Sequence, residues 1–312
     1  MRAAVPQPVT RRAARHAFVV LGLIACSAPS PERETPGAEA EGRIADVAVT
    51  ASAVTASAVT ASAVTASAVT ATADRATVAP RDGGVLSLAR AAGGSDGTAY
   101  TVAVPTSTGF IVGKVAGGAP RDTSIAPTHD LSVCRPFSES LVPSRDGGIG
   151  NGVVWLAGVA SGPRDDAPKR VRLVLDGCRL DPRVLRIAAG GTVMITSRDA
   201  MMTRLQFRDV GGVSAARGTV LFTDAGQVVP ANQAAGVPGL VQVRDDLHPW
   251  IRAYLAVSPH PFVAVTGADG TFRFDGVPPG SYTLVVWHER FGTTQQRVRV
   301  DAHIETRVEL RY

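Results

Sequence analysis

Aromatic residues and lysine are both scarce in this 312-residue chain. Phe, Trp and Tyr make up 5% of the residues, and lysine is found only at positions 114 and 169. The net charge of +5 at pH 7 rests on arginines that are scattered along the chain rather than grouped. Nucleic-acid recognition needs a concentrated basic patch with aromatic platforms. We therefore exclude a nucleic-acid partner.

Catalytic sequence motifs are also scarce. The sequence contains no HExxH zinc-peptidase motif. Ser281, or the carboxylates of Asp245 and Asp246 near His248, would suit a hydrolase, but nothing completes an ordered triad with them. We therefore expect no enzymatic activity.

No apolar run is long enough to cross a bilayer near the N-terminus. Ala17 to Ala25 is about nine residues, whereas a spanning helix requires roughly 20. Three arginines precede this run, at positions 11, 12 and 15. A basic segment followed by a short apolar one predicts an export signal over residues 1–25.

The signal ends in Leu23-Ile24-Ala25-Cys26, which resembles the bacterial lipobox. The resemblance implies cleavage before Cys26 and lipid on its thiol and its new amine. Ser27 in the next position implies the outer membrane, so we expect an exported lipoprotein that faces the periplasm or the cell surface. An ordinary signal peptide with an incidental cysteine is the alternative.

Residues 26–104 form a low-complexity segment rich in Ala, Thr, Ser, Pro and Gly. At its centre a five-residue unit, Thr-Ala-Ser-Ala-Val, recurs between Thr50 and Thr70. A period of five matches neither the helix period of 3.6 nor the strand period of 2, so no consistent apolar face results. The side chains are too small to offset the entropy of ordering. We predict a disordered tether between the membrane and the folded part.

Export determines which cysteines of this chain are expected to form a disulfide. If Cys26 carries lipid, Cys134 and Cys178 remain as a pair in an oxidising compartment. We expect a disulfide between them, with two unrelated buried thiols as the alternative. No cysteine or histidine cluster has the spacing of a structural zinc site.

The sequence after residue 104 predicts a series of short strands separated by turn signals. Such a series without a long amphipathic helix predicts an all-β sandwich architecture. The clearest part is Asp245 to Arg290, where alternating and apolar runs are broken by Ala268-Asp269-Gly270 and by Pro278-Pro279-Gly280. The expected strands include residues 110–115, 130–133, 152–159, 170–175, 184–187, 192–196, 204–207, 219–223, 240–243, 262–266, 271–274, 282–288 and 304–312.

Two resemblances refine this expectation. The block Val174 to Val184, with Gly190-Gly191-Thr192 and the HPW, HPF and VWHE segments at His248, His260 and His288, resembles bacterial exported cupredoxin-like proteins of the plastocyanin or methylamine-utilisation type. Ala268 to Val286 resembles the carboxypeptidase-regulatory-like, transthyretin-like module. The resemblances imply a cupredoxin-like Greek-key domain over residues 105–255. They also imply a carboxypeptidase-regulatory-like segment over residues 256–312, which pairs with a strand at 109–117.

The copper ligands of the cupredoxin family are largely missing. By the resemblance, Thr203 stands at the first histidine position, Asp245 at the cysteine position and Ile251 at the methionine position. Only His248 is retained. A blue copper centre needs a thiolate with two imidazoles, so the resemblance implies a degenerate site.

Other ligands remain possible on the residues alone. His248, His260 and His288, with Asp245, would suit copper or zinc if they converge; otherwise each is a hydrogen-bonded structural histidine. Trp250 and Trp287 would suit a sugar-stacking platform, or else belong to the core. We expect a binding or scaffolding protein of the cell envelope, with a membrane anchor and an envelope protein or glycan as partner. A metal-binding or redox accessory protein and a carbohydrate-binding module are the alternatives.

Overall fold

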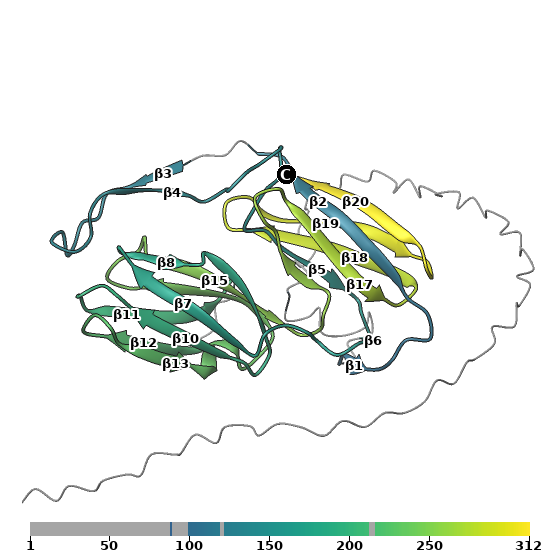
Figure 1. Ribbon diagram of the computed structural model, residues 1–312, viewed down its shortest axis with the longest axis horizontal. Coiled ribbons are helices and arrows are strands. Elements are labelled where there is room, and N and C mark those ends of the chain that lie inside the picture. Colours follow the sequence, from purple (N-terminus) through teal and green to yellow (C-terminus); the bar gives the residue numbers. More distant parts are fainter. Residues whose placement is uncertain (1–87, 89–98, 119–121, 212–215) are drawn as a thin grey trace, which may run out of the picture. The chain divides into compact units, whose positions relative to one another are not determined.

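A computed structural model describes residue 88 and residues 99–118, 122–211 and 216–312. This part of the chain contains twenty β-strands and one short 3-10 helix, η2 (Asn232–Ala235). The fold class is therefore all-β, as the sequence predicts (Figure 1). The expected signal peptide, the lipidation site Cys26 and most of the expected tether lie outside the described residues. Within them, no helix has the length and apolar character that crossing a bilayer requires.

The first sandwich consists of two sheets around one core. Its strands are β7 (Arg170–Asp176), β8 (Arg179–Asp181), β9 (Val184–Ala188), β10 (Thr192–Ser197), β11 (Thr203–Asp209), β12 (Gly218–Phe222), β13 (Val228–Ala231), β14 (Gly239–Asp245) and β15 (Arg252–Ser258). The sheet orders are β13-β10-β7-β8 and β12-β11-β14-β15-β9. Leu173, Phe207 and Phe222 are among the buried residues that both sheets contribute to this core.

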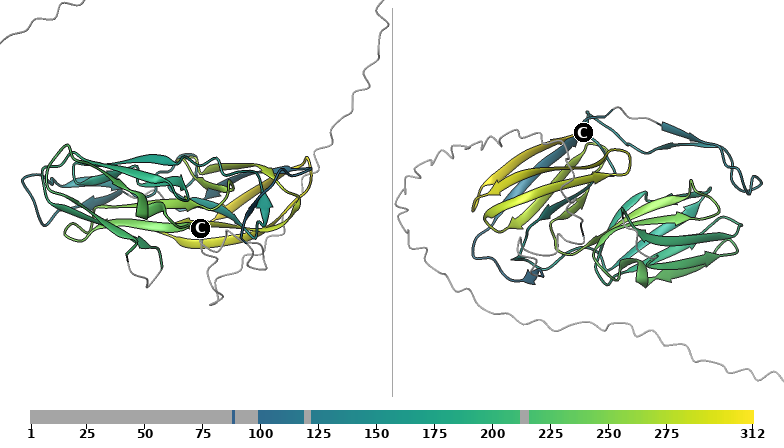
Figure 2. Two further views of the ribbon diagram at one scale, coloured as in Figure 1. Left: turned by 90° about the horizontal axis from the view of Figure 1, so that it is seen from below. Right: turned by 180° about the vertical axis from the view of Figure 1, so that it is seen from behind.

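The second sandwich joins segments from both ends of the described chain. Its strands are β2 (Gly109–Ala116), β5 (Val153–Ala157), β16 (Val263–Val265), β17 (Thr271–Val277), β18 (Gly280–His288), β19 (Gly292–Val300) and β20 (Glu305–Arg311). The sheet orders are β16-β5-β18-β19 and β17-β2-β20. Figure 2 shows β2, drawn in blue, among the yellow C-terminal strands when seen from behind.

The pairing expected between the C-terminal segment and a strand at 109–117 is present: β2 pairs with β17 and β20. The strand β5 was not expected there, because it lies within residues 105–255, yet it pairs with β18 of the C-terminal segment. The first sandwich is therefore an insertion between β5 and β16 of the second. A strand pairs wherever its edge finds a partner, so sequence proximity alone does not assign it to a sheet.

The folded part begins before the expected end of the tether at residue 104. The short strand β1 (Thr101–Val102) pairs in parallel with β6 (Ser161–Gly162). The Tyr100 hydroxyl donates a hydrogen bond to the carbonyl of Pro163 at 2.6 Å. Leu88 is only 1% exposed. These contacts draw residues from the end of the low-complexity segment into the fold.

A hairpin between the strands β2 and β5 matters for the site. It consists of β3 (Asp122–Ile125) and β4 (Phe137–Ser140), and we call residues 126–136 between them the capping loop. The expected strand at 130–133 is wrong: Asp130 has a φ of 51°, and the Val133 and Cys134 N–H groups donate back to the Asp130 carbonyl. A left-handed residue with such bonds makes a turn rather than a strand.

Contacts between the two sandwiches are both apolar and ionic. A third buried cluster combines Tyr254 and Ala256 of the first sandwich with Trp155 and Trp287 of the second. The Tyr254 and Trp287 rings pack edge to face, with centroids 4.8 Å apart. Arg183, which precedes β9, forms ion pairs with Glu139 on β4 and with Glu289 after β18.

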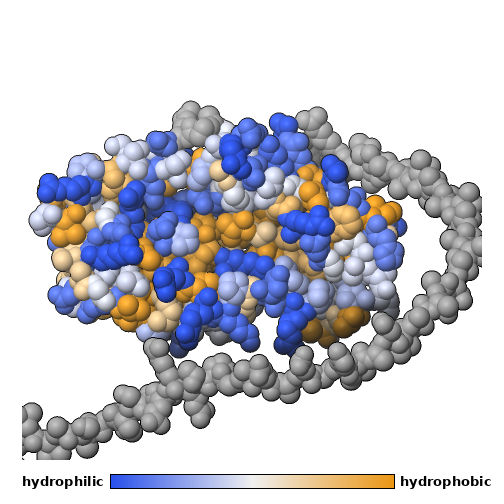
Figure 3. Space-filling view, in the orientation of Figure 1, coloured by the Kyte–Doolittle hydropathy of each residue, from blue (hydrophilic) through white to orange (hydrophobic). Residues whose placement is uncertain are grey.

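The surface follows from strand alternation. In β20 the buried residues Thr306, Val308 and Leu310 alternate with charged residues. Figure 3 shows hydrophilic and hydrophobic residues interleaved over the face in view. Period-2 alternation places polar side chains on the solvent face of each sheet.

Candidate functional site: a carboxylate–imidazole network

The four positions that the resemblance assigns to copper ligands lie together at one end of the first sandwich. Thr203 begins β11, Asp245 ends β14, and His248 and Ile251 occupy the connection from β14 to β15. All four are 0% exposed. The Asp245 N–H donates to the Ile251 carbonyl at 3.1 Å, and the Ile251 N–H donates to the His248 carbonyl at 2.8 Å. This short connection therefore folds back on itself and directs the His248 ring inward.

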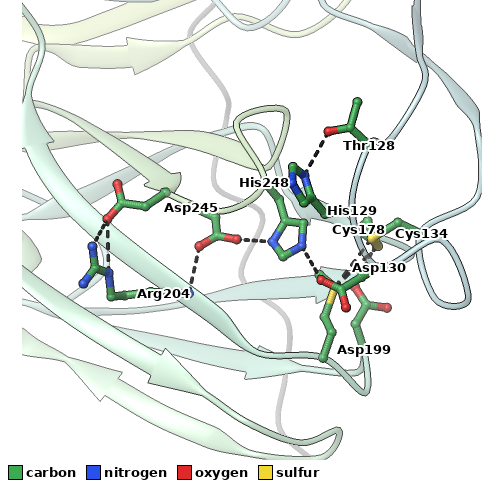
Figure 4. A network of polar contacts seen from close by, with 11 residues as sticks. Thr128, His129, Asp130, Cys134, Cys178, Asp199, Arg204, Asp245 and His248 are labelled. Atoms are coloured by element: carbon green, nitrogen blue, oxygen red, sulfur yellow. Dashed lines mark hydrogen bonds and ion pairs between the residues drawn. A yellow bond between two sulfur atoms is a disulfide. The ribbon is translucent and has the colours of Figure 1, made fainter.

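Both ring nitrogens of His248 contact carboxylates (Figure 4). Nδ1 bonds Oδ2 of Asp245, and Nε2 lies 2.8 Å from Oδ2 of Asp130. Both nitrogens of His248 therefore have a hydrogen-bonding partner. The second oxygen of Asp245 accepts from the Arg204 N–H at 2.8 Å. The network is thus satisfied without any further group.

Asp130 reaches this network from the capping loop, 118 residues before His248. The loop is held in place by a disulfide between Cys134 and Cys178, whose Cα atoms are 5.4 Å apart. Cys178 lies in the tight turn between β7 and β8. The carboxylate of Asp199 accepts hydrogen bonds from the Gly177 and Cys178 N–H groups at 2.8 and 2.7 Å and so fixes this turn.

The residues present do not fit a cupredoxin copper centre. Such a centre requires a thiolate and two imidazoles with free lone pairs. Asp245 supplies an oxygen where the thiolate belongs, and the two described cysteines form the disulfide. Neither nitrogen of His248 offers a free lone pair to a metal, because each contacts a carboxylate.

The three histidines singled out in the sequence do not converge. His260 is buried in the second sandwich, where Nε2 lies 3.0 Å from the Leu156 carbonyl and Nδ1 accepts from the Phe262 N–H. His288 ends β18, and its Nδ1 accepts from the Arg290 N–H at 3.0 Å. Across residues 99–118, 122–211 and 216–312, no group of three or more His, Cys, Asp or Glu side chains is arranged to hold a metal ion. The expected metal set of His248, His260, His288 and Asp245 is therefore not assembled.

Burial has an electrostatic consequence at His288. Desolvation lowers the pKa of its imidazole below the usual value of 6.5, and the neighbouring Glu289 carboxylate opposes this shift without reversing it. The ring stacks 4.9 Å from the Phe291 ring and 6.4 Å from the Tyr312 ring. This environment is that of a core histidine.

The tryptophans do not form a shared platform either. Trp287 is 8% exposed and packs on Tyr254 between the sandwiches. Trp250 packs against the core of the first sandwich and meets the His248 ring edge-on at 5.3 Å. The two indoles belong to different clusters, so the expected stacking surface is not assembled.

Sequence reasoning missed two residues of the network. Asp130 carries no motif, and its only signal is its position four residues before Cys134. Arg204 contributes a backbone N–H, which any residue would supply. The role of Asp199 as the acceptor for the Cys178 turn is likewise visible only in three dimensions.

Comparisons with known proteins give one family match and several solved structures of low similarity. The family model of the carboxypeptidase regulatory-like domain matches residues 242–311. Among solved structures, the chain is similar to amicyanin from Paracoccus versutus, at 21% identity over 30% of this chain and 86% of that chain, with a TM-score of 0.25. It is also similar to a purple cupredoxin from Nitrosopumilus maritimus, at 19% identity over 28% of this chain and 99% of that chain, with a TM-score of 0.23. A search of curated proteins gives no match.

Proposed function

We propose that this chain is a non-catalytic binding or scaffolding protein of the cell envelope. It is exported and anchored at the outer membrane through lipid on Cys26. Its first sandwich is a cupredoxin-like domain that has lost its copper site and is retained for its shape. The second sandwich is an accessory β-domain of the carboxypeptidase regulatory-like kind.

The main support is the engagement of His248. The single histidine retained from the ligand set has one carboxylate at each nitrogen. Burial of a polar group is unfavourable unless it is hydrogen-bonded. Asp130 and Asp245 meet that requirement for His248, so the former ligand position works as a structural link between the sandwich and the capping loop.

The same engagement disfavours a hydrolase. A serine nucleophile needs an imidazole nitrogen that accepts its proton while the other nitrogen is oriented by a carboxylate. At His248 carboxylates hold both positions, so no acceptor is left. Ser281, the serine considered above, lies on β18 in the other sandwich.

Export is supported by the disulfide as well as by the signal pattern. Disulfides persist in oxidising compartments and are rare in the cytosol. The Cys134–Cys178 bridge is buried, with both residues 0% exposed. Such a bridge suits a protein that folds after translocation.

Two measurements test the proposal. Purified oxidised protein mixed with Cu(II) is expected to show no thiolate-to-copper band, which lies at roughly 600 nm in blue centres, and to retain no stoichiometric copper after desalting. Metabolic labelling with a palmitate analogue is expected to mark the chain and to be lost in Cys26→Ser. Stoichiometric copper in the oxidised protein, or turnover of ester, peptide or glycoside substrates, would overturn the proposed function.

A further inference from the structure

Three sulfur atoms from separate segments meet beside the carboxylate–imidazole network. Cys134 belongs to the capping loop, Cys178 to the turn between β7 and β8, and Met201 to the segment before β11. The Met201 Sδ lies 3.5 Å from the Cys134 Sγ and 3.9 Å from the Cys178 Sγ. All three residues are at most 4% exposed. The thioether thus faces both sulfurs of the disulfide.

We propose that reduction of the disulfide converts this cluster into a binding site for a soft monovalent metal ion, Cu(I) or its analogue Ag(I). The site differs from the lost cupredoxin position, since it uses none of Thr203, Asp245, His248 or Ile251. It also goes beyond the proposed function, which concerns the oxidised protein.

The redox step balances with an external dithiol. The Cys134–Cys178 bond accepts two electrons and two protons from an exchange-active dithiol, which becomes a disulfide itself. The products are two thiols. One metal ion then replaces the two thiol protons, which pass to solvent, and the Met201 thioether completes the ligand set. Thiol–disulfide exchange of this kind proceeds through a mixed disulfide.

The geometry suits three-coordination. Metal–sulfur bonds of about 2.3 Å, the length of zinc–thiolate bonds, place three ligand sulfurs ~4 Å apart in a trigonal centre. The two distances from Met201 are already close to this separation. Only the two cysteine sulfurs must separate, and Cys134 lies in a surface loop between two short strands, where Leu131 is 59% exposed.

The ligand types select the metal. Thiolate and thioether are soft ligands that favour Cu(I). Zinc sites are completed by additional thiolate, imidazole or carboxylate ligands. The carboxylate of Asp199, beside Cys178, is engaged by the Gly177 and Cys178 N–H groups. A set of two cysteines and one methionine therefore favours Cu(I) over Zn(II).

The chain offers a matched control. Met202 adjoins Met201 in the sequence, but it is 55% exposed, whereas Met201 is 4% exposed. Met201→Leu and Met202→Leu have the same change in chemistry and nearly conserve volume, so both are expected to fold. Only Met201→Leu removes a ligand.

The experiment uses full-length protein under anaerobic conditions. The protein is treated with dithiothreitol, desalted, and titrated with Cu(I) against a chromogenic chelator, with far-UV circular dichroism to check the fold. One Cu(I) per chain is expected in the reduced protein and none in the oxidised protein. Met201→Leu is expected to weaken affinity by more than the roughly tenfold cost of losing even an outer-shell partner, and Met202→Leu to leave it unchanged. X-ray absorption is expected to show about three sulfurs near 2.3 Å.

Several results would overturn the proposal. They are equal Cu(I) binding by oxidised and reduced protein, equal weakening by Met201→Leu and Met202→Leu, and binding of Zn(II) without Cu(I) or Ag(I). A disulfide that reacts with dithiothreitol only when circular dichroism reports unfolding would also overturn it. The first of these outcomes would also count against the proposed function, because it places copper on the oxidised protein. The other outcomes involve only the reduced protein or its variants, so they overturn this proposal alone.

Discussion

Arg183 and Glu289 form a two-pronged ion pair across the two sandwiches. The Arg183 Nε donates to Oε1 of Glu289 at 2.7 Å, and Nη2 donates to Oε2 at 2.6 Å. Nη1 of the same guanidinium bonds both oxygens of Glu139 at 3.1 Å. The Arg183 and Glu289 side chains are 8% and 4% exposed. One arginine therefore connects β9, β18 and the hairpin that carries the capping loop.

Replacing Arg183 with methionine should destabilise the protein by about 3–5 kcal/mol, because Glu289 is left as a buried, unpaired charge. The double variant Arg183→Met, Glu289→Gln should recover part of this loss. Urea unfolding followed by tryptophan fluorescence measures the difference. The exposed Arg198–Asp176 pair is the control, and Arg198→Ala should cost less than about 1 kcal/mol. Equal losses of stability in Arg183→Met and Arg198→Ala would contradict the interpretation that the buried charge of Glu289 depends on Arg183.

The sequence predicts those features of the fold that depend on residues close together in the chain, and it misses those that depend on distant residues. Strand alternation depends on neighbours two residues apart, so a strand such as β20 can be recognised from its own residues, and the strand expected at 304–312 contains it. The Cys134–Cys178 disulfide was expected by counting cysteines, and the structure contains it. The pairing of Arg183 with Glu289 spans 106 residues, and that of His248 with Asp130 spans 118. No local signal specifies such pairs, because they depend on how the two sandwiches and the hairpin pack.

The three histidines illustrate the same limit. The sequence leaves open whether they converge on a metal or are each a hydrogen-bonded structural histidine. The structure instead gives each its own acceptors and donors: carboxylates for His248, main-chain groups for His260, and a main-chain N–H for His288. Proximity to proline or tryptophan in sequence does not bring side chains together when the intervening strands belong to different sheets.

Replacing His248 should lower the free energy of unfolding much more than replacing Asp130, its partner on the capping loop. In His248→Ala the carboxylate of Asp245, which is 0% exposed, keeps only the Arg204 N–H, so we expect a loss of about 3–5 kcal/mol. Asp130 is 47% exposed, and Asp130→Asn should cost less than about 1 kcal/mol. Asparagine also tolerates the positive φ of this position. Chemical denaturation measures both, and similar losses would show that the network does not depend on the buried pair.

His288 should make the protein less stable in acid. Burial lowers the pKa of His288 in the folded chain below the 6.5 of the unfolded chain. Well above pH 6.5 the ring is neutral in both states and adds no pH dependence. As the pH falls below 6.5, the unfolded chain takes up a proton that the folded chain resists, so the free energy of unfolding decreases until the lower folded pKa is passed. The slope from one group is at most about 1.4 kcal/mol per pH unit.

In the variant His288→Gln, the free energy of unfolding should decrease less steeply than in the parent as the pH falls below 6.5. The measurement is urea unfolding at a series of pH values, taken as the difference between parent and variant. The exposed His303, replaced in the same way, serves as the control. A slope that persists unchanged in His288→Gln would show that other groups are responsible for it.

Rebuilding the copper ligands tests whether the carboxylate–imidazole network occupies the former metal position. The variant combines Thr203→His, Asp245→Cys and Ile251→Met with Asp130→Ala, which frees Nε2 of His248. With Cu(II) it should show a band at roughly 600 nm from the new thiolate. Cys134 and Cys178 stay in their disulfide, so position 245 provides the reactive thiol of the folded part.

The matched control keeps Asp245 and carries the other three substitutions. It should show no such band, because imidazole and thioether ligands alone lack the thiolate transition. Absorption spectroscopy after desalting and circular dichroism of the same samples report colour and fold together. If the full variant folds yet stays colourless with copper, positions 203, 245 and 251 do not correspond to ligand positions, and the sandwich must be explained without a copper-binding ancestor.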